Sequence, residues 1–149
     1  AHEKESMKAL LETAAAMKSP SAKVIVLLGA EGGGRDKAKR PIMGQLSAQM
    51  ADVVIVSNVD PYDDDPSLII GQVAAGALEA GKKEGETLFK IDDRRVAICK
   101  AVSLAGPGDV ILLTGKGAEQ AIVGRGGKLT PWDERKVARE ALRERLGKA

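Results

Sequence analysis

Three glycine-rich or charged segments of this 149-residue chain hold the residues that could do chemistry. The first segment spans 29–41, where glycines are followed by basic residues: Gly32, Gly33, Gly34, Arg35, Lys37, Lys39 and Arg40. Glycines let a backbone approach a ligand closely, and cations before a helix amino terminus favour an anion. The pattern predicts either a carboxylate or phosphate site or a solvated basic loop. It is not a Walker A loop, because Arg-Asp-Lys follows the glycines.

The second and third segments are acidic and glycine-rich. Segment 58–66 contains Asp60, Asp63, Asp64 and Asp65, of which the first three could face a cation, an amine, Mg²⁺ or water. Asp65 precedes Pro66, and this pair predicts a helix N-cap followed by proline in the first turn. Segment 114–119 reads Thr-Gly-Lys-Gly-Ala-Glu, and its final glutamate could receive an amine.

Composition excludes several classes of function. The net charge is only +2 and aromatic residues are 2% of the chain, which argues against a nucleic-acid partner. No apolar run approaches the length of a membrane-spanning helix. One cysteine and one histidine cannot form a Cys/His metal cluster, so we expect no metal site of that kind. The lone Cys99 favours a reducing, cytoplasmic location.

The elements that must position these segments alternate along the chain. Three apolar, unalternated runs at 23–28, 52–57 and 109–114 are typical of strands buried on both faces. Shorter strands are expected at 88–91 and at 121–123, the latter at a sheet edge. Helices are expected at 3–17, 41–50, from Pro66, at 94–104 and after Asp133.

This alternation predicts a single α/β domain over 1–149, with a lead-in helix in 1–22 and a body in 23–149. The expected fold is Rossmann-like and doubly wound, with a mostly parallel sheet and helices on both faces. Ligands of such sheets bind beyond the carboxyl ends of the strands. All three segments described above follow predicted strands, so we expect them to line one site.

Taken in order, the motifs resemble a known family. They are Gly-Gly-Gly-Arg35-Asp-Lys-x-Lys-Arg-Pro41, Asp60-Pro61, Asp93-Arg94-Arg95, Pro107-Gly108-Asp109, Gly115-Lys-Gly-x-Glu119 and the run from Trp132 to Glu140. Over essentially the whole chain they resemble the carboxy-terminal domain of the Mur ligases. The similarity is greatest to the MurE type, which adds an amino acid to UDP-N-acetylmuramoyl-dipeptide.

The resemblance implies an ATP-dependent amide ligase of peptidoglycan synthesis, and hence of cell-wall biogenesis, cell shape and cell division. In that family ATP and Mg²⁺ are held mainly by a central domain, and the UDP-linked dipeptide by further domains. Neither those domains nor their cofactors are expected in this chain. We therefore expect it to be a fragment, or a processed chain, that is inactive alone.

The resemblance also assigns residues. Arg35 matches the arginine that contacts the carboxylate of the incoming amino acid, while Gly115 and Glu119 match residues at its far end. Asp60 and Tyr62 fall in the family's Asp-Asn-Pro-Arg motif, and Tyr62 replaces the arginine that reads the second carboxylate of meso-diaminopimelate. With acidic residues nearby, this favours L-lysine, or another amino acid that ends in an amine, as the substrate.

Two alternatives remain open. Folylpolyglutamate and cyanophycin synthetases carry a related third domain, although the Lys-Arg-Pro and Gly-Lys-Gly-x-Glu motifs favour the MurE type. The second alternative is a free-standing α/β binding module that has no catalytic activity. An upstream Gly-Lys-Ser/Thr loop in the same reading frame would separate this module from a ligase domain.

Overall fold

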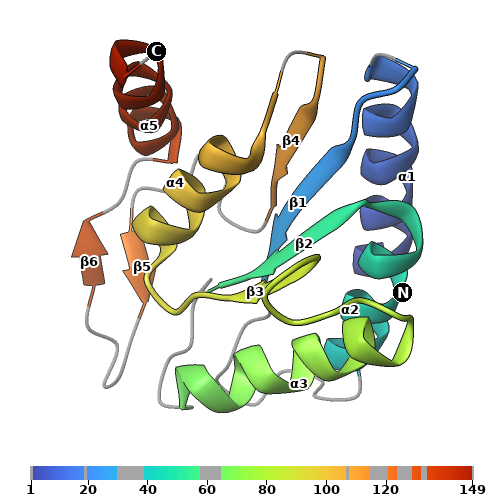
Figure 1. Cartoon of the computed structure of the whole chain (residues 1–149). Coiled ribbons are helices and arrows are strands. Elements are labelled where there is room, and N and C mark those ends of the chain that lie inside the picture. The colour runs from blue at the N-terminus through green and yellow to red at the C-terminus, as the bar shows by residue number, and fades with distance from the viewer. Residues whose placement is uncertain are drawn as a thin grey trace.

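Eleven helices and strands follow one another in the computed structural model of the chain, which describes residues 2–18, 20–29, 39–57, 65–106, 108–114, 121–123, 129–131 and 134–148. In chain order these elements are α1 (His2–Met17), β1 (Val24–Leu28), α2 (Lys39–Met50), β2 (Val53–Val56), α3 (Pro66–Glu79), β3 (Leu88–Lys90), α4 (Arg94–Leu104), β4 (Val110–Leu113), β5 (Ala121–Val123), β6 (Leu129–Pro131) and α5 (Glu134–Lys148) (Figure 1). The three long strands and the two shorter ones lie where the apolar runs predicted them.

Four strands form an all-parallel sheet in the order β3-β2-β1-β4. β1 is central and is fully buried along its length, because it pairs with β2 on one side and with β4 on the other. Apolar residues at every position suit such a strand, since neither face meets water. The Rossmann-like, parallel part of the sequence prediction is confirmed.

The strand expected at 121–123, at an edge of the sheet, does not pair with the parallel sheet. β5 pairs antiparallel with β6 in a separate two-stranded sheet, with Ala121 opposite Pro131. β6 was not predicted, because Leu-Thr-Pro is short and ends in a residue that has no amide hydrogen to donate. Proline is tolerated there because the strand is short and peripheral.

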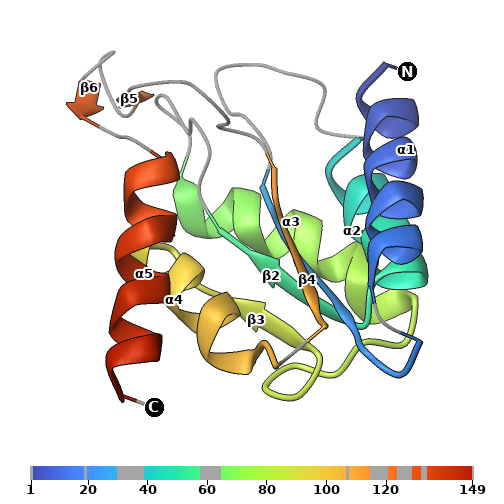
Figure 2. The ribbon, with the colours of Figure 1, turned by 90° about the horizontal axis from the view of Figure 1, so that it is seen from above.

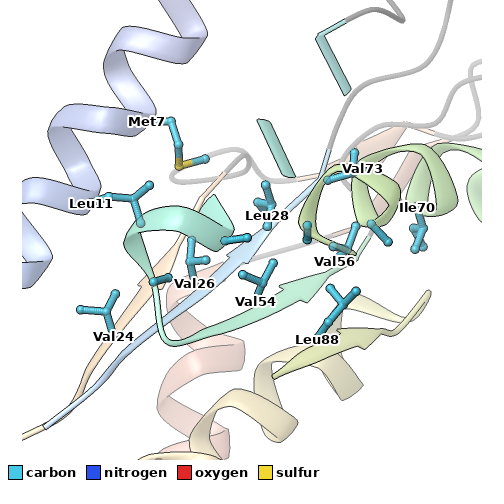
Figure 3. Packing of buried hydrophobic residues seen from close by; sticks show 14 of the residues in the cluster. Met7, Leu11, Val24, Val26, Leu28, Val54, Val56, Ile70, Val73 and Leu88 are labelled. Atoms are coloured by element: carbon cyan, nitrogen blue, oxygen red, sulfur yellow. The ribbon is translucent and has the colours of Figure 1, made fainter. Parts of the chain in front are cut away.

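Helices cover both faces of the parallel sheet (Figure 2). Alternate residues of β1 point to opposite sides. Val24, Val26 and Leu28 pack with α1, α2 and α3 (Figure 3), whereas Ile25 and Leu27 pack with α4 and α5. The helix in the 1–22 lead-in segment therefore contributes Met7, Leu11 and Ala14 to the core of the body.

The contact between α2 and α3 depends on two glycines. A Cβ atom added to Gly44 would lie 1.9 Å from the carbonyl oxygen of Val73, and one added to Gly76 would lie 1.8 Å from that of Pro41. Only glycine lets the two helix backbones approach so closely. This packing fixes the amino-terminal turn of α2 against α3.

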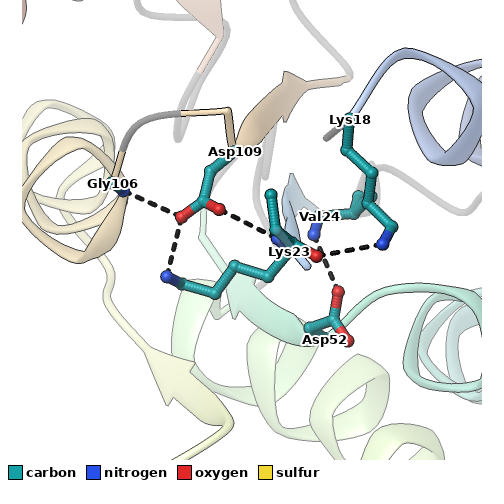
Figure 4. Close-up of polar contacts among 7 residues, drawn as sticks. Lys18, Lys23, Val24, Asp52, Gly106 and Asp109 are labelled. Atoms are coloured by element: carbon teal, nitrogen blue, oxygen red, sulfur yellow. Dashed lines mark hydrogen bonds and ion pairs between the residues drawn. The ribbon is translucent and has the colours of Figure 1, made fainter. Parts of the chain in front are cut away.

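Two aspartates organise the amino ends of the strands (Figure 4). The Asp109 carboxylate accepts hydrogen bonds from the Lys23 ammonium at 2.7 Å, the Gly106 amide at 2.8 Å and the Lys23 amide at 2.9 Å. These bonds, led by that from the Lys23 side chain, lower the pKa of Asp109 from 3.8 to about 2. Asp52 accepts from the Val24 amide at 2.8 Å. Both residues stabilise the edge of the sheet opposite the predicted ligand site.

Candidate functional site

The carboxyl ends of β1, β2 and β4 lie at one edge of the sheet, the upper end of the strands in Figure 2. The Ser57 amide, just after β2, donates to the Leu28 carbonyl at 2.9 Å. The Thr114 amide, just after β4, donates to the Leu27 carbonyl at 3.1 Å. The chain therefore leaves the three strands at neighbouring points, as the sequence predicted for the three segments.

The strand order places a topological switch point at this edge. From β1 the chain moves outward to β2 and β3, and it then returns to the other side of β1 as β4. In doubly wound sheets ligands bind where the strand order reverses, beyond the carboxyl ends. Here that point lies between Gly29, which follows β1, and Thr114, which follows β4.

Most of the predicted site residues belong to segments that leave this edge. Gly32, Gly33, Gly34, Arg35, Lys37, Asp60, Tyr62, Gly115 and Glu119 lie outside the described residues. Lys39 is the first residue of α2, although its side chain is not described. The ligand roles of these residues remain predictions.

Arg40 is the one predicted anion-binding residue whose side chain the structure describes. It is 1% exposed, and its Nη1 donates to the Oε1 of Gln72 in α3 at 2.6 Å. This contact ties the first turn of α2 to the middle of α3. Arg40 therefore holds the start of α2, which follows segment 30–38, against α3. Its contact with an anion remains a prediction.

Two aspartates start helices at the same edge. Asp65 accepts from the Ser67 amide at 2.9 Å, so the predicted N-cap of α3 is confirmed. Asp93 caps α4 by accepting from the Val96 amide at 3.1 Å. Capping occupies these carboxylates with backbone amides. Asp133, after which the last helix was expected, lies outside the described residues, and α5 begins at Glu134.

Arg94 is a buried residue of this edge that sequence reasoning did not assign to the site. It is 2% exposed, and its Nη2 donates to the carbonyl oxygen of Thr114 at 2.7 Å. The signal in the sequence was the Asp93-Arg94-Arg95 motif at the start of a largely apolar helix. That signal does not distinguish it from its neighbour Arg95, whose side chain is 53% exposed.

Within the described ranges, no three His, Cys, Asp or Glu side chains come together as metal ligands. In the same part of the chain, no helix combines the length and apolar character needed to cross a membrane. The described residues at this edge of the sheet offer hydrogen bonds and charge. These come from backbone groups, from the helix caps Asp65 and Asp93, and from the buried guanidinium groups of Arg40 and Arg94.

Comparison with known proteins shows the family to which the chain belongs. Residues 1–117 match the family model described as "Mur ligase, glutamate ligase domain". The chain is 46% identical over 121 residues to a UDP-N-acetylmuramyl-tripeptide synthetase from Roseiflexus sp., covering 81% of this chain and 23% of that protein. It is 42% identical over 120 residues to a UDP-N-acetylmuramoyl-L-alanyl-D-glutamate–2,6-diaminopimelate ligase from Chlorobium phaeobacteroides, covering 80% and 22%.

A solved structure agrees with these matches. The structure of a UDP-N-acetylmuramoyl-L-alanyl-D-glutamate–2,6-diaminopimelate ligase superposes with a TM-score of 0.79 at 26% identity, over 96% of this chain and 28% of that one. The chain spans about a quarter of the length of the relatives it matches. On its sequence, its strand order and this superposition, the chain belongs to the Mur ligase family as its carboxy-terminal, glutamate ligase domain.

Proposed function

We propose that this chain is the amino-acid-binding domain of a MurE-like ligase, which joins an amino acid to UDP-N-acetylmuramoyl-dipeptide in the cytoplasm at the expense of ATP. The observation that carries the proposal is the meeting of the ends of β1, β2 and β4 at one edge. From this edge depart the three segments whose motifs match the family. The relatives named above act on UDP-linked muramoyl peptides, according to their names.

In this proposal Arg35 binds the α-carboxylate of the incoming amino acid. A guanidinium can form two parallel, charge-assisted hydrogen bonds with a carboxylate, which a lysine cannot. The glycines before it let the backbone approach the ligand, and Lys37, Lys39 and Arg40 contribute positive charge to the same segment. Gly115 and Glu119 contact the far end of the amino acid from the other side of the switch point.

Holding the amino acid at its carboxylate leaves its amine free. That amine is the nucleophile of the ligation, because it attacks the activated carboxylate of the dipeptide. This domain would therefore supply orientation, which is a large part of the rate of a two-substrate reaction. It would not supply the phosphoryl chemistry.

ATP and Mg²⁺ are assigned to the central domain of the ligase. The described residues offer no cluster of acidic side chains for Mg²⁺. The sequence contains no Gly-x-x-x-x-Gly-Lys-Ser/Thr loop that would cradle the phosphates. We therefore expect the 149-residue chain alone to bind ATP weakly and to release no ADP.

We further propose that the amino acid ends in an amine, as L-lysine does. Tyr62 stands where the family has the arginine that reads a second carboxylate, and Asp60 lies two residues before it. A single ion pair at 4 Å contributes about 4 kcal/mol at an effective dielectric near 20, before desolvation is subtracted. About 1.4 kcal/mol already changes affinity tenfold, so a fraction of this energy decides the substrate.

The test uses the full-length ligase that carries this domain. ADP release is measured with ATP, Mg²⁺, UDP-N-acetylmuramoyl-dipeptide and a panel of amino acids, and the product is identified by mass. We expect release that needs both the dipeptide and one amino acid, and no release from the 149-residue chain alone. Ligation that survives deletion of this domain would refute the proposal, and so would ADP release by the isolated chain.

A further inference from the structure

Arg94 lies in a position that is unfavourable for a cation. It is the first residue of α4, where the helix dipole is positive, and it is 2% exposed. Removing a guanidinium from water is costly unless hydrogen bonds replace the water. The bond from its Nη2 to the Thr114 carbonyl, at 2.7 Å, is such a replacement. Both the helix dipole and the loss of water disfavour an arginine at this position, so we expect Arg94 to have a specific role here.

Thr114 is fixed by three hydrogen bonds. Its amide and its hydroxyl both donate to the carbonyl of Leu27, at 3.1 Å and 2.8 Å, and its own carbonyl accepts from Arg94. The first two bonds hold the residue to the central strand β1. The third holds the Thr114 carbonyl toward the first turn of α4.

The segment that follows Thr114 reads Gly-Lys-Gly-Ala-Glu. Glycines place few restrictions on backbone direction, so we expect the path of this segment to depend on how Thr114, the residue before it, is held. Arg94 holds the carbonyl of Thr114, on the β4 side of the switch point.

We propose that Arg94 is a positioning residue of the ligase, which sets the exit of the chain from β4 at Thr114 and thereby the ability of the domain to select its amino acid. The inference rests on the proposed function, since it concerns the amino-acid site of that ligase. Arg94 acts through Thr114, and it does not itself touch the amino acid.

The neighbouring Arg95 provides a matched control. It lies on the same turn of α4, but its side chain is 53% exposed and pairs with Glu140 of α5 at 2.7 Å. Arg95→Met removes one arginine from the same turn without touching β4. A second control is Asp109→Asn, which weakens the fold at the amino ends of the strands, far from Thr114 along β4.

The first measurement is steady-state kinetics of the full-length ligase. We expect Arg94→Met to raise KM for the amino acid at least tenfold while KM for ATP stays within twofold of the wild type. Arg94→Lys keeps a cation and should recover part of this loss. Arg95→Met and Asp109→Asn should leave KM for the amino acid within twofold, even where they lower the Tm.

The second measurement is hydrogen–deuterium exchange of the 149-residue chain. In Arg94→Met, exchange of a peptide covering 113–120 should rise at least fivefold, while a peptide within β1 should exchange at the wild-type rate. Arg95→Met should change neither peptide. If Arg94→Met does not give folded protein, Arg94→Lys carries both measurements, with at least a threefold effect expected in each.

The outcomes separate the two proposals. Wild-type ligase that releases no ADP in response to any amino acid would overturn the proposed function and, with it, the kinetic role of Arg94. Active wild-type ligase whose KM for the amino acid is unchanged in both Arg94 variants would overturn the positioning role alone. Unchanged exchange at 113–120 would also overturn it, because Thr114 would then not depend on Arg94.

Discussion

Arg40 of α2 and Gln72 of α3, which are 32 positions apart in the sequence, are joined by a hydrogen bond of 2.6 Å from Nη1 to Oε1. The bond connects the first turn of α2 to α3 next to the place where Gly76 meets Pro41. A polar contact and a close backbone contact thus hold the same helix end. Because α2 begins where the segment 30–38 ends, this pair locates one border of the proposed amino-acid site.

Gln72→Ala is expected to lower the free energy of unfolding by about 1–3 kcal/mol, because a buried guanidinium loses a hydrogen-bond acceptor. Urea unfolding of the 149-residue chain measures the change. Gln45→Ala, on the exposed side of α2, serves as the control and should alter stability by less than about 0.5 kcal/mol. Equal effects of the two substitutions would show that the Arg40–Gln72 bond contributes nothing specific.

Two glycines of α3 should respond in opposite directions to the same substitution. Gly76→Ala places a methyl group against the Pro41 carbonyl and should destabilise the chain by about 1–3 kcal/mol through overpacking. A Cβ atom at Gly71 meets nothing within 4 Å, so Gly71→Ala should stabilise by up to about 1 kcal/mol through helix propensity. Thermal unfolding of both variants gives the signs, and a stabilising Gly76→Ala would show that α2 and α3 are not in close contact.

The Asp109 carboxylate should make the fold sensitive to acid. Its pKa is lowered to about 2 in the folded chain, so its contribution to stability is complete above the unfolded value of 3.8. The contribution is lost as pH falls from about 4 to about 2, and it amounts to about 2 kcal/mol at neutral pH.

Asp109→Asn tests this linkage. Urea unfolding at pH 7 should show the wild type to be more stable than the variant, and the difference should shrink at pH 3 and below. Asp65→Asn is a useful comparison, because asparagine caps a helix about as well as aspartate and should preserve the stability at both pH values. A wild-type advantage that grows on acidification would contradict the assigned direction.

The sequence predicted the parallel sheet because its strands consist of β-branched and aliphatic residues with no polar alternation, as in Val24–Leu28. The N-cap at Asp65 was predictable because Asp-Pro is a local signal that needs no tertiary context. The helix expected at 41–50 begins at Lys39, since proline is tolerated within the first turn and does not have to be its first residue.

Arg94 and Gln72 could not be found in this way. Arg94 and Arg95 are identical in type and adjacent, yet one is buried and the other is half exposed, and the packing of α4 on the parallel sheet decides which. Gln72 is a single amide in an apolar helix, and its partner Arg40 comes from another helix. The pairing of β5 with β6 was also unpredictable, because two three-residue segments carry too few residues to show a period.

The charge of the residues around Tyr62 should decide which amino acid the ligase prefers. With the full-length ligase, we expect kcat/KM for L-lysine to exceed that for meso-diaminopimelate by at least tenfold. Tyr62→Arg restores the family's arginine and should narrow or reverse this ratio, whereas Tyr62→Phe should preserve it. A wild-type preference for meso-diaminopimelate would refute the charge argument, and a preference for a small neutral amino acid would show that the acidic residues do not face the substrate.

The most direct test of the central claim, that this domain binds the amino acid, is the pair of KM values of Arg35→Lys in the full-length ligase. We expect a KM for the amino acid raised more than tenfold and a KM for ATP within twofold of the wild type, because lysine cannot form the paired hydrogen bonds with a carboxylate. Equal increases in both KM values would contradict it, since Arg35 would then serve the phosphates or the fold.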